Sequence, residues 1–321
     1  MRNTMTRTEC AAYLRERDGF LILNHRRPDG DAMGCAAALC RGLRTLGKRA
    51  FVLPNPETTE RYLSLVEDLY PAPGFRPDTV VAVDLAEEGI LQNNAGDWAG
   101  KVQLCIDHHP SNSGYARQGW VDPAAGACGE LIYFLLLELG VEITPELAEP
   151  LYIAVTTDTG CFRYKNTSSQ TLRVGAALLE AGAPIDLNRT LFMKKSRGRL
   201  LLESRMIAGL EFFQAGEADI AAVTLEDLRD CAVTEEDMED IASVAGSVRG
   251  VELSVTLREV EAGSWKVSVR TGQYSNASLV CAEFGGGGHG MAAGCTVKGS
   301  LEEVREALKA AVGRHWHALP L

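Results

Sequence analysis

The sequence has no long apolar run, no broad basic character and no C-x-x-C spacing. No stretch approaches the roughly 18 apolar residues that a helix needs to cross a bilayer, so we expect no membrane-spanning segment and no membrane partner. Residues 1–17 are polar and mixed in charge, which is not the pattern of a signal peptide. The formal net charge of −11 argues against a protein that coats long duplex nucleic acid through a wide cationic surface.

Nine cysteines are scattered along the chain, an odd number. Most lie in apolar helix or strand patterns, as Cys40 and Cys105 do. A disulfide framework or a zinc site would require closer and more regular spacing. We interpret them as reduced, buried thiols, which is typical of a cytoplasmic protein.

With 321 residues, the chain has room for two domains. In the first half, apolar strand patterns alternate with helical patterns, which predicts an α/β domain with a doubly wound, mainly parallel sheet. The expected strands are residues 20–24, 50–53, 79–84 and 102–107. The expected helices are residues 32–46, 129–139, 145–157 and 168–181.

The pattern changes after residue 185, which divides the chain into a catalytic domain (1–185), a basic linker (186–202) and a smaller α+β domain (203–321). We expect an active-site cleft between the two domains. The expected strands of the second domain are residues 209–213, 220–223, 251–259 and 264–270. We also expect an acidic helical stretch at 234–244 and a final helix at 301–315.

Histidine and aspartate side chains gather at the ends of these elements. Ligands collect outside the carboxyl ends of parallel strands, so these side chains should meet at one edge of the sheet. Alone, each has a simpler interpretation: Asp31 could cap the helix 32–46, Asp84 or Asp158 could be a turn residue, and His25 could be structural. The full set is His25, Asp29, Asp31, Asp84, Asp107, His108, His109 and Asp158.

Together these side chains predict a metal centre. Crowded carboxylates repel one another unless cations lie between them. Mixed carboxylate and imidazole ligands suit manganese, with zinc, iron or cobalt as alternatives. Two divalent ions about 3.5–4 Å apart are a common arrangement for hydrolysing phosphoesters. We therefore predict two divalent metal ions, with Mn²⁺ as the first choice.

The motifs resemble those of the DHH phosphoesterase superfamily, and within it the stand-alone bifunctional oligoribonuclease (nanoRNase)/pAp phosphatase group. Residues 24–32 (NHRRPDGDA), Asp84, residues 107–110 (DHHP), residues 157–164 (TDTGCFRY) and residues 284–294 (FGGGGHGMAAG) are similar to the family's ordered motifs. The resemblance covers nearly the whole chain and includes the DHH-associated C-terminal domain, DHHA1.

The resemblance implies a role for each ligand. His25, Asp29 and Asp84 would hold one metal, while Asp31, Asp84, His108 and Asp158 would hold the second. Asp84 would bridge the two ions. His109 would face the scissile phosphate, with Asp107 orienting the histidines.

The glycine-rich segment predicts a substrate site in the second domain. Bare backbone N–H groups can approach a phosphate closely, and a nearby arginine can bind it in a bidentate way. The resemblance supports Arg270, Gly287, Gly288 and His289 as substrate contacts. The alternative is that the glycines serve only the packing of a turn.

We therefore expect a phosphoric ester hydrolase of short nucleotides: RNA fragments of two to five residues, pApA and the 3′-phosphate of pAp. A cyclic di-AMP phosphodiesterase is an alternative, and a non-catalytic nucleotide-binding protein is another from a different class. The expected partners are short RNA or nucleotide substrates, and a homodimer is left open.

Overall fold

The computed structural model describes residues 4–238 and 240–316. The chain divides into two compact units, Met1–Lys194 and Lys195–Leu321, and each has its own hydrophobic core. The division falls inside the segment expected to be a linker, residues 186–202. The domain limits at 185 and 203 remain proposals.

The first unit contains a five-stranded, all-parallel sheet in the order β2-β1-β3-β4-β5. Strands β1 and β3 are buried along their whole length because both faces of the sheet are covered. The strand order reverses between β1 and β3, which is where ligands bind in such sheets. The strands are β1 (Phe20–Leu23), β2 (Ala50–Val52), β3 (Thr79–Val83), β4 (Leu104–Asp107) and β5 (Gln118–Val121).

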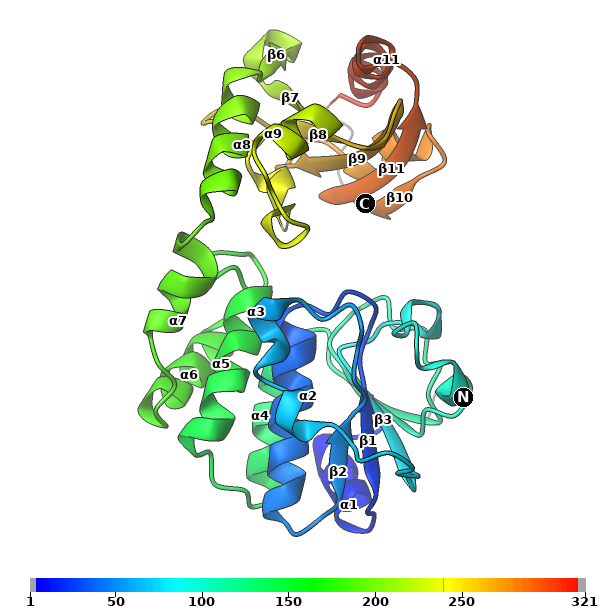
Figure 1. Ribbon diagram of the computed structural model, residues 1–321, viewed down its shortest axis with the longest axis vertical. Coiled ribbons are helices and arrows are strands. Elements are labelled where there is room, and N and C mark those ends of the chain that lie inside the picture. The colour runs from blue at the N-terminus through cyan, green and yellow to red at the C-terminus, as the bar shows by residue number, and fades with distance from the viewer. Residues whose placement is uncertain (1–3, 239, 317–321) are drawn as a thin grey trace. The chain divides into compact units, whose positions relative to one another are not determined.

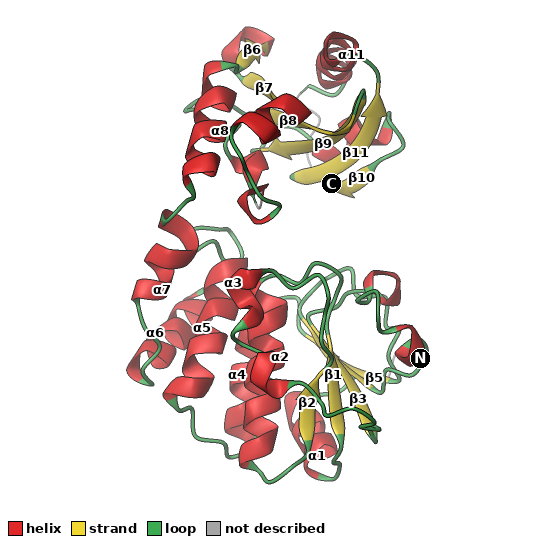
Figure 2. Ribbon diagram, viewed as in Figure 1, coloured by secondary structure: helices red, strands yellow, loops and turns green. Residues whose placement is uncertain are grey.

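The long helices α2, α4, α5 and α6 lie together on one side of this sheet (Figures 1 and 2). Helices α2 and α5 are in close contact because position 34 is glycine: a Cβ there would lie 2.2 Å from the Pro150 carbonyl oxygen. On the opposite side, Leu85, Leu91 and Val102 of the β3–β4 connection complete a smaller apolar cluster. The helices are α1 (Arg7–Arg15), α2 (Gly30–Thr45), α3 (Glu60–Leu63), α4 (Cys128–Glu138), α5 (Pro145–Asp158), α6 (Ser169–Glu180) and α7 (Asp186–Asn188).

The second unit is built on a six-stranded mixed sheet in the order β10-β11-β9-β8-β7-β6. Among the described strands of this second sheet, β7 and β8 form the one parallel pair, and the other neighbouring strands are antiparallel. The expected fold class, a parallel α/β unit followed by an α+β unit, is confirmed. The elements are α8 (Arg197–Ala208), β6 (Glu211–Phe213), β7 (Ala218–Val223), α9 (Leu225–Asp230), β8 (Leu253–Glu261), β9 (Ser264–Thr271), α10 (Ala277–Ala282), β10 (Gly287–His289), β11 (Ala292–Lys298) and α11 (Leu301–Arg314).

Two segments of the second half differ in local structure from what the sequence suggested. Residues 197–202, at the end of the expected linker, form the first half of α8, whose Ser196 cap accepts a hydrogen bond from the Arg199 N–H. The basic residues obscured the apolar stripe that Leu202 and Met206 bury. Within the described part of the segment expected to be an acidic helix, residues 234–244, Glu236–Met238 and Ile241–Ser243 are short 3₁₀ turns, and the left-handed φ of 52° at Asp240 does not fit a helix. Within the described residues, no helix combines the length and apolarity needed to span a membrane.

Candidate metal centre

Strands β1, β3 and β4 and the C-terminus of α5 bring the expected ligands together. Three sets of side chains offer donor atoms that all lie within 4.8 Å of one another in each set. Asp84 and His108 each belong to two of the three sets, so together they connect all three. The sets are His25–Asp29–Asp84, Asp31–His108–Asp158 and Asp84–His108–His109.

Asp84 follows β3 directly and lies at the centre of the cluster. Its side chain is 3% exposed, and its Oδ1 atom has no hydrogen-bond partner among the described residues. Oδ1 lies 3.5 Å from His108 Nε2, and Oδ2 lies 3.8 Å from His25 Nε2. Its left-handed φ of 52° is unusual for a residue other than glycine and turns the chain sharply at the strand end. A buried carboxylate oxygen without a donor is the kind of atom that a cation satisfies.

The second orphaned atom is His108 Nε2. The other ring nitrogen, Nδ1, lies 3.2 Å from the Ala125 carbonyl oxygen, so the proton belongs on Nδ1. Nε2 then presents its lone pair toward Asp31 Oδ2 at 3.8 Å and Asp158 Oδ2 at 3.6 Å. A histidine that donates through one nitrogen and leaves the other free is typical of a metal ligand.

Asp29 and Asp31 also accept hydrogen bonds from N–H groups at the N-termini of helices. Asp29, not Asp31, caps α2, accepting from the N–H groups of Asp31 and Ala32. Asp31 is thereby free to accept from the Cys128 N–H at 2.7 Å and the Gly129 N–H at 2.9 Å, at the start of α4. The positive end of the α4 dipole favours a carboxylate in this position.

The electrostatics of the cluster fit a cation site. Burial, together with the charges of neighbouring aspartates, raises the pKa of Asp31 and of Asp84 well above the usual range. Burial also raises the pKa of Asp158. Burial opposes ionisation of Asp29 as well, but hydrogen bonding and charge from His25 outweigh it and lower the Asp29 pKa. Oxygen and imidazole donors in this number suit divalent cations such as manganese.

His109 belongs to the third donor set and also contacts Asp107. Its Nδ1 lies 2.7 Å from Asp107 Oδ1, and this hydrogen bond raises the pKa of His109. Asp107 is fully buried and accepts further hydrogen bonds from the His108 N–H at 2.8 Å and the Asn112 amide at 2.6 Å. The arrangement leaves His109 Nε2 as the ring nitrogen that a substrate oxygen could reach.

In the second unit, the expected substrate residues lie around an open groove beside β9 and β11. Arg270, Gly287 and Gly288 line it, together with Lys266, and His289 is exposed on β10 but is not part of the lining. A Cβ on Gly288 would lie 2.6 Å from the Ala292 carbonyl oxygen, so packing of the hairpin requires glycine there. Nothing lies within 4 Å of a Cβ on Gly287, so that glycine is open to a ligand.

Comparison with known proteins identifies the family. Residues 19–155 match the DHH family, N-terminal domain, and residues 220–314 match the DHHA1 domain. Over 297 residues, the chain is 35% identical to the bifunctional oligoribonuclease and PAP phosphatase NrnA of Thermus thermophilus, covering 90% of this chain and 88% of that protein. The chain belongs to the DHH family. The expected family and the expected class of enzyme, a phosphoric ester hydrolase, are confirmed.

Solved structures share the fold of this chain over most of its length. An exopolyphosphatase-related protein from Bacteroides fragilis has a TM-score of 0.86 at 23% identity, with 96% of each chain covered. RecJ of Thermus thermophilus, solved in complex with Mn²⁺, has a TM-score of 0.53 at 16% identity, covering 98% of this chain and 55% of that one. At these identities, the likeness concerns the fold alone.

Two further residues of the DHH domain escaped the sequence analysis. Asn112 donates to Asp107, as described, and Asn55 donates to the Asn24 side chain at 2.8 Å and to the His25 carbonyl at 2.9 Å. Asn55 therefore fixes the backbone that carries His25. No local sequence pattern distinguishes a buried asparagine in a loop from an ordinary turn residue. For Asn112, the one available signal was its position five residues after Asp107.

Proposed function

We propose that this DHH-family enzyme hydrolyses phosphoester bonds in short nucleotides at a centre for two divalent cations, with Mn²⁺ as the first choice. The observation that carries the proposal is the position of Asp84. Its carboxylate is buried, lacks a donor for Oδ1 among the described residues, and directs one oxygen toward His25 and the other toward His108. The name of the Thermus thermophilus relative, oligoribonuclease and PAP phosphatase, supports the nucleotide substrates.

His25, Asp29 and Asp84 would hold one cation, and Asp31, Asp84, His108 and Asp158 would hold the other. Bound cations of this kind lower the pKa of water and neutralise charge on phosphoryl oxygens. The chain contributes fixed orientation: the Ala125 carbonyl holds the His108 ring, and the first N–H groups of α4 hold Asp31. The ligands are therefore largely in place before a cation arrives.

His109 would act on the substrate directly. Asp107 holds its Nδ1 proton and raises its pKa, so the imidazolium form persists to higher pH than for an isolated histidine. A positive ring beside the scissile phosphate would stabilise developing negative charge or give a proton to the leaving oxygen.

Arg270, Gly287, Gly288 and His289 would contact the remainder of the nucleotide. Lys266 lies on the same face of β9 as Arg270, four residues before it. Across the sheet, Lys266 is directly opposite Arg258 of β8. Glu235 already forms an ion pair with Arg258. Lys266 and Arg270 both line the groove, and two cations on one wall support a short polyanion rather than a neutral ligand as its occupant.

A parallel hydrolysis assay with Mn²⁺ on pAp, pApA, cyclic di-AMP and a five-nucleotide RNA tests the proposal. We expect turnover of the linear nucleotides by the wild-type chain and none by Asp84→Ala, which removes a ligand shared by both cations. Arg270→Ala should raise KM with a smaller effect on kcat, because it removes a contact remote from the reaction.

Three other outcomes of this assay would change the functional assignment. Hydrolysis of cyclic di-AMP in preference to the linear nucleotides would move the assignment to a cyclic dinucleotide phosphodiesterase. Binding of nucleotides without turnover under any divalent cation would make the chain a binding protein. Mn²⁺-dependent activity in Asp84→Ala would refute the bridging role.

A further inference from the structure

One loop contacts one expected metal ligand directly and a second through Asn166. The loop joins β5 to α4 and includes Ala125 and Gly126. The Ala125 carbonyl accepts the His108 Nδ1–H at 3.2 Å, and the Gly126 carbonyl accepts the Asn166 amide at 2.8 Å. The same Asn166 nitrogen lies 3.0 Å from the Asp158 carbonyl and 3.3 Å from Asp158 Oδ2. The position of this loop therefore sets the orientation of His108 and, through Asn166, that of Asp158.

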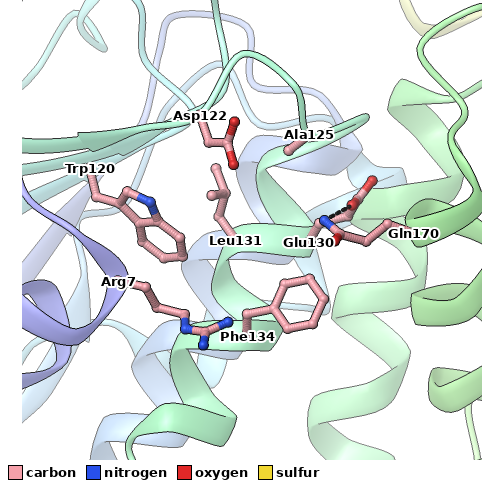
Figure 3. A pocket seen from close by; sticks show the side chains of 8 residues that line it. All are labelled: Arg7, Trp120, Asp122, Ala125, Glu130, Leu131, Phe134 and Gln170. Carbon is pink, nitrogen blue, oxygen red and sulfur yellow. Dashed lines mark hydrogen bonds between the residues drawn. The ribbon is translucent and has the colours of Figure 1, made fainter.

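A buried carboxylate fixes the loop from behind. Glu130, in the first turn of α4, is fully buried. Its Oε1 accepts the Gly126 N–H at 3.0 Å and the Thr171 hydroxyl at 2.7 Å, and its Oε2 accepts the Gln170 amide at 3.3 Å. Figure 3 shows Glu130 and Gln170 joined at one wall of the pocket that Ala125 also lines. Three neutral donors around a buried carboxylate hold it in one rotamer.

The loop has little freedom to move away from these contacts. A Cβ at position 126 would lie 2.8 Å from the Asn166 carbonyl oxygen, 2.9 Å from Thr171 Oγ1 and 3.0 Å from Glu130 Oε1. The absence of a side chain at Gly126 is what lets the backbone lie against Glu130 and Asn166 at once. Its tight fit is an observation independent of the hydrogen bonds.

We propose that Glu130 and Asn166 are positioning residues of the metal centre. Glu130 fixes the Ala125–Gly126 backbone, which holds the His108 ring with Nε2 toward the cations, and Asn166 ties the same backbone to Asp158. The inference rests on the proposed metal site and deepens it. Groups that orient metal ligands in this way typically change metal affinity by about 10–100-fold when removed.

The test compares Mn²⁺ binding by Glu130→Ala, Glu130→Gln and a matched control, Glu138→Ala. Glu138 lies on the same helix but accepts from Arg7 at 3.1 Å and from Thr8 at 3.1 Å, on α1. Mn²⁺ affinity is measured by electron paramagnetic resonance on variants whose folding is checked by circular dichroism. We expect Glu130→Ala to weaken Mn²⁺ binding about 10–100-fold, Glu130→Gln to recover most of that loss because its carbonyl oxygen can still accept, and Glu138→Ala to bind like the wild type.

A second readout needs no metal. In ¹⁵N spectra of the metal-free protein, His108 should be the Nδ1–H tautomer in the wild type and in Glu138→Ala. It should become a tautomer mixture in Glu130→Ala, because the Ala125 carbonyl is no longer fixed. Asn166→Ala should weaken Mn²⁺ binding while leaving this tautomer in place, since it acts on Asp158.

Two results would overturn the inference. One is a Glu130→Ala variant that binds Mn²⁺ like the wild type, although it loses as much thermal stability as Glu138→Ala does. Glu130 would then stabilise only the start of α4. The other is an unchanged His108 tautomer together with weakened binding. Failure of the metal site itself would look different, because the wild-type chain would not bind Mn²⁺ at all.

Discussion

Replacing Asp84 by asparagine should have opposite effects on stability with and without metal. In the metal-free protein, the Asp84 carboxylate is buried among other acids, and burial together with the charge of Asp31 raises its pKa well above the usual value. A neutral amide of similar size removes the repulsion. With Mn²⁺, the same carboxylate is the shared ligand. We therefore expect Asp84→Asn to be the more stable protein without metal and the less stable one with it.

The size of each effect can be worked out. Each unit by which the folded-state pKa of Asp84 is raised corresponds to about 1.4 kcal/mol of destabilisation of the charged form, which a neutral amide avoids. For a unit the size of Met1–Lys194, each kcal/mol shifts Tm by about 2–4 °C, so a gain of about 2 kcal/mol raises Tm by about 4–8 °C. Free Mn²⁺ at 100 times its Kd would stabilise the wild type by about 2.7 kcal/mol. That corresponds to about 5–11 °C, which the variant should not show.

The pH dependence has a definite sign. Because the folded-state pKa of Asp84 is raised, the native protein holds a proton that the unfolded chain releases. The metal-free wild type therefore loses stability as the pH rises from about 4, the unfolded value, through the raised folded-state value. The Tm advantage of Asp84→Asn should accordingly be small near pH 4 and full above the raised pKa.

Differential scanning fluorimetry on chelator-treated protein measures the metal-free Tm, its dependence on pH and the Tm shift on addition of Mn²⁺. Asp219→Asn is the matched control: Asp219 is a fully buried aspartate of the second unit, with one oxygen that lacks a partner among the described residues. It should leave the Mn²⁺ shift intact. A lower metal-free Tm for Asp84→Asn, or a Mn²⁺ shift equal to that of the wild type, would refute the reasoning.

Three other predictions follow from single contacts. Asp107→Asn should lower the pKa of His109 and move the alkaline limb of a kcat/KM–pH profile to lower pH; an unchanged profile would separate His109 from the chemistry. Gly34→Ala forces a Cβ against the backbone of α5 and should cost about 1–3 kcal/mol in thermal unfolding, whereas Gly96→Ala, with open space around it, should cost far less. A thiol reagent should label Cys161 first in the native protein, because the other eight cysteines are buried; mass spectrometry of the labelled peptides would show any other order.

The sequence was informative where function depends on side chains that follow a regular element. The apolar run before Asp107 indicated a buried strand, and the order of strand ends then placed His25, Asp84 and His108 at one edge of the sheet. The simpler interpretation of Asp31, as the N-cap of the helix, does not hold, because the N-cap is Asp29. A difference of two residues in a helix start is beyond what capping preferences resolve, since both aspartates are good caps.

The contacts that no pattern revealed are those made by the backbone of distant loops. The Ala125 carbonyl that orients His108 belongs to a residue without a functional side chain, 17 positions away along the chain. Strand β5, which leads into that loop, is a half-buried edge strand and lacks the continuous apolar run of a central strand. Its position depends on pairing with β4, a long-range interaction that local composition does not encode.

The expected metal ligands differ in how much they contribute to the stability of the fold. Mutations of these ligands therefore fall into two kinds. Asp29 caps α2, and Asp31 accepts two N–H groups at the start of α4, so removing either one destabilises a helix terminus as well as the centre. Asp84 Oδ1 and His108 Nε2 satisfy no hydrogen bond in the described structure. Their cost to the metal-free fold has no compensation except a bound cation. Asp84 is therefore the position at which loss of activity can be attributed to lost metal binding without a contribution from lost folding, whereas replacing His108 also removes its hydrogen bond to the Ala125 carbonyl.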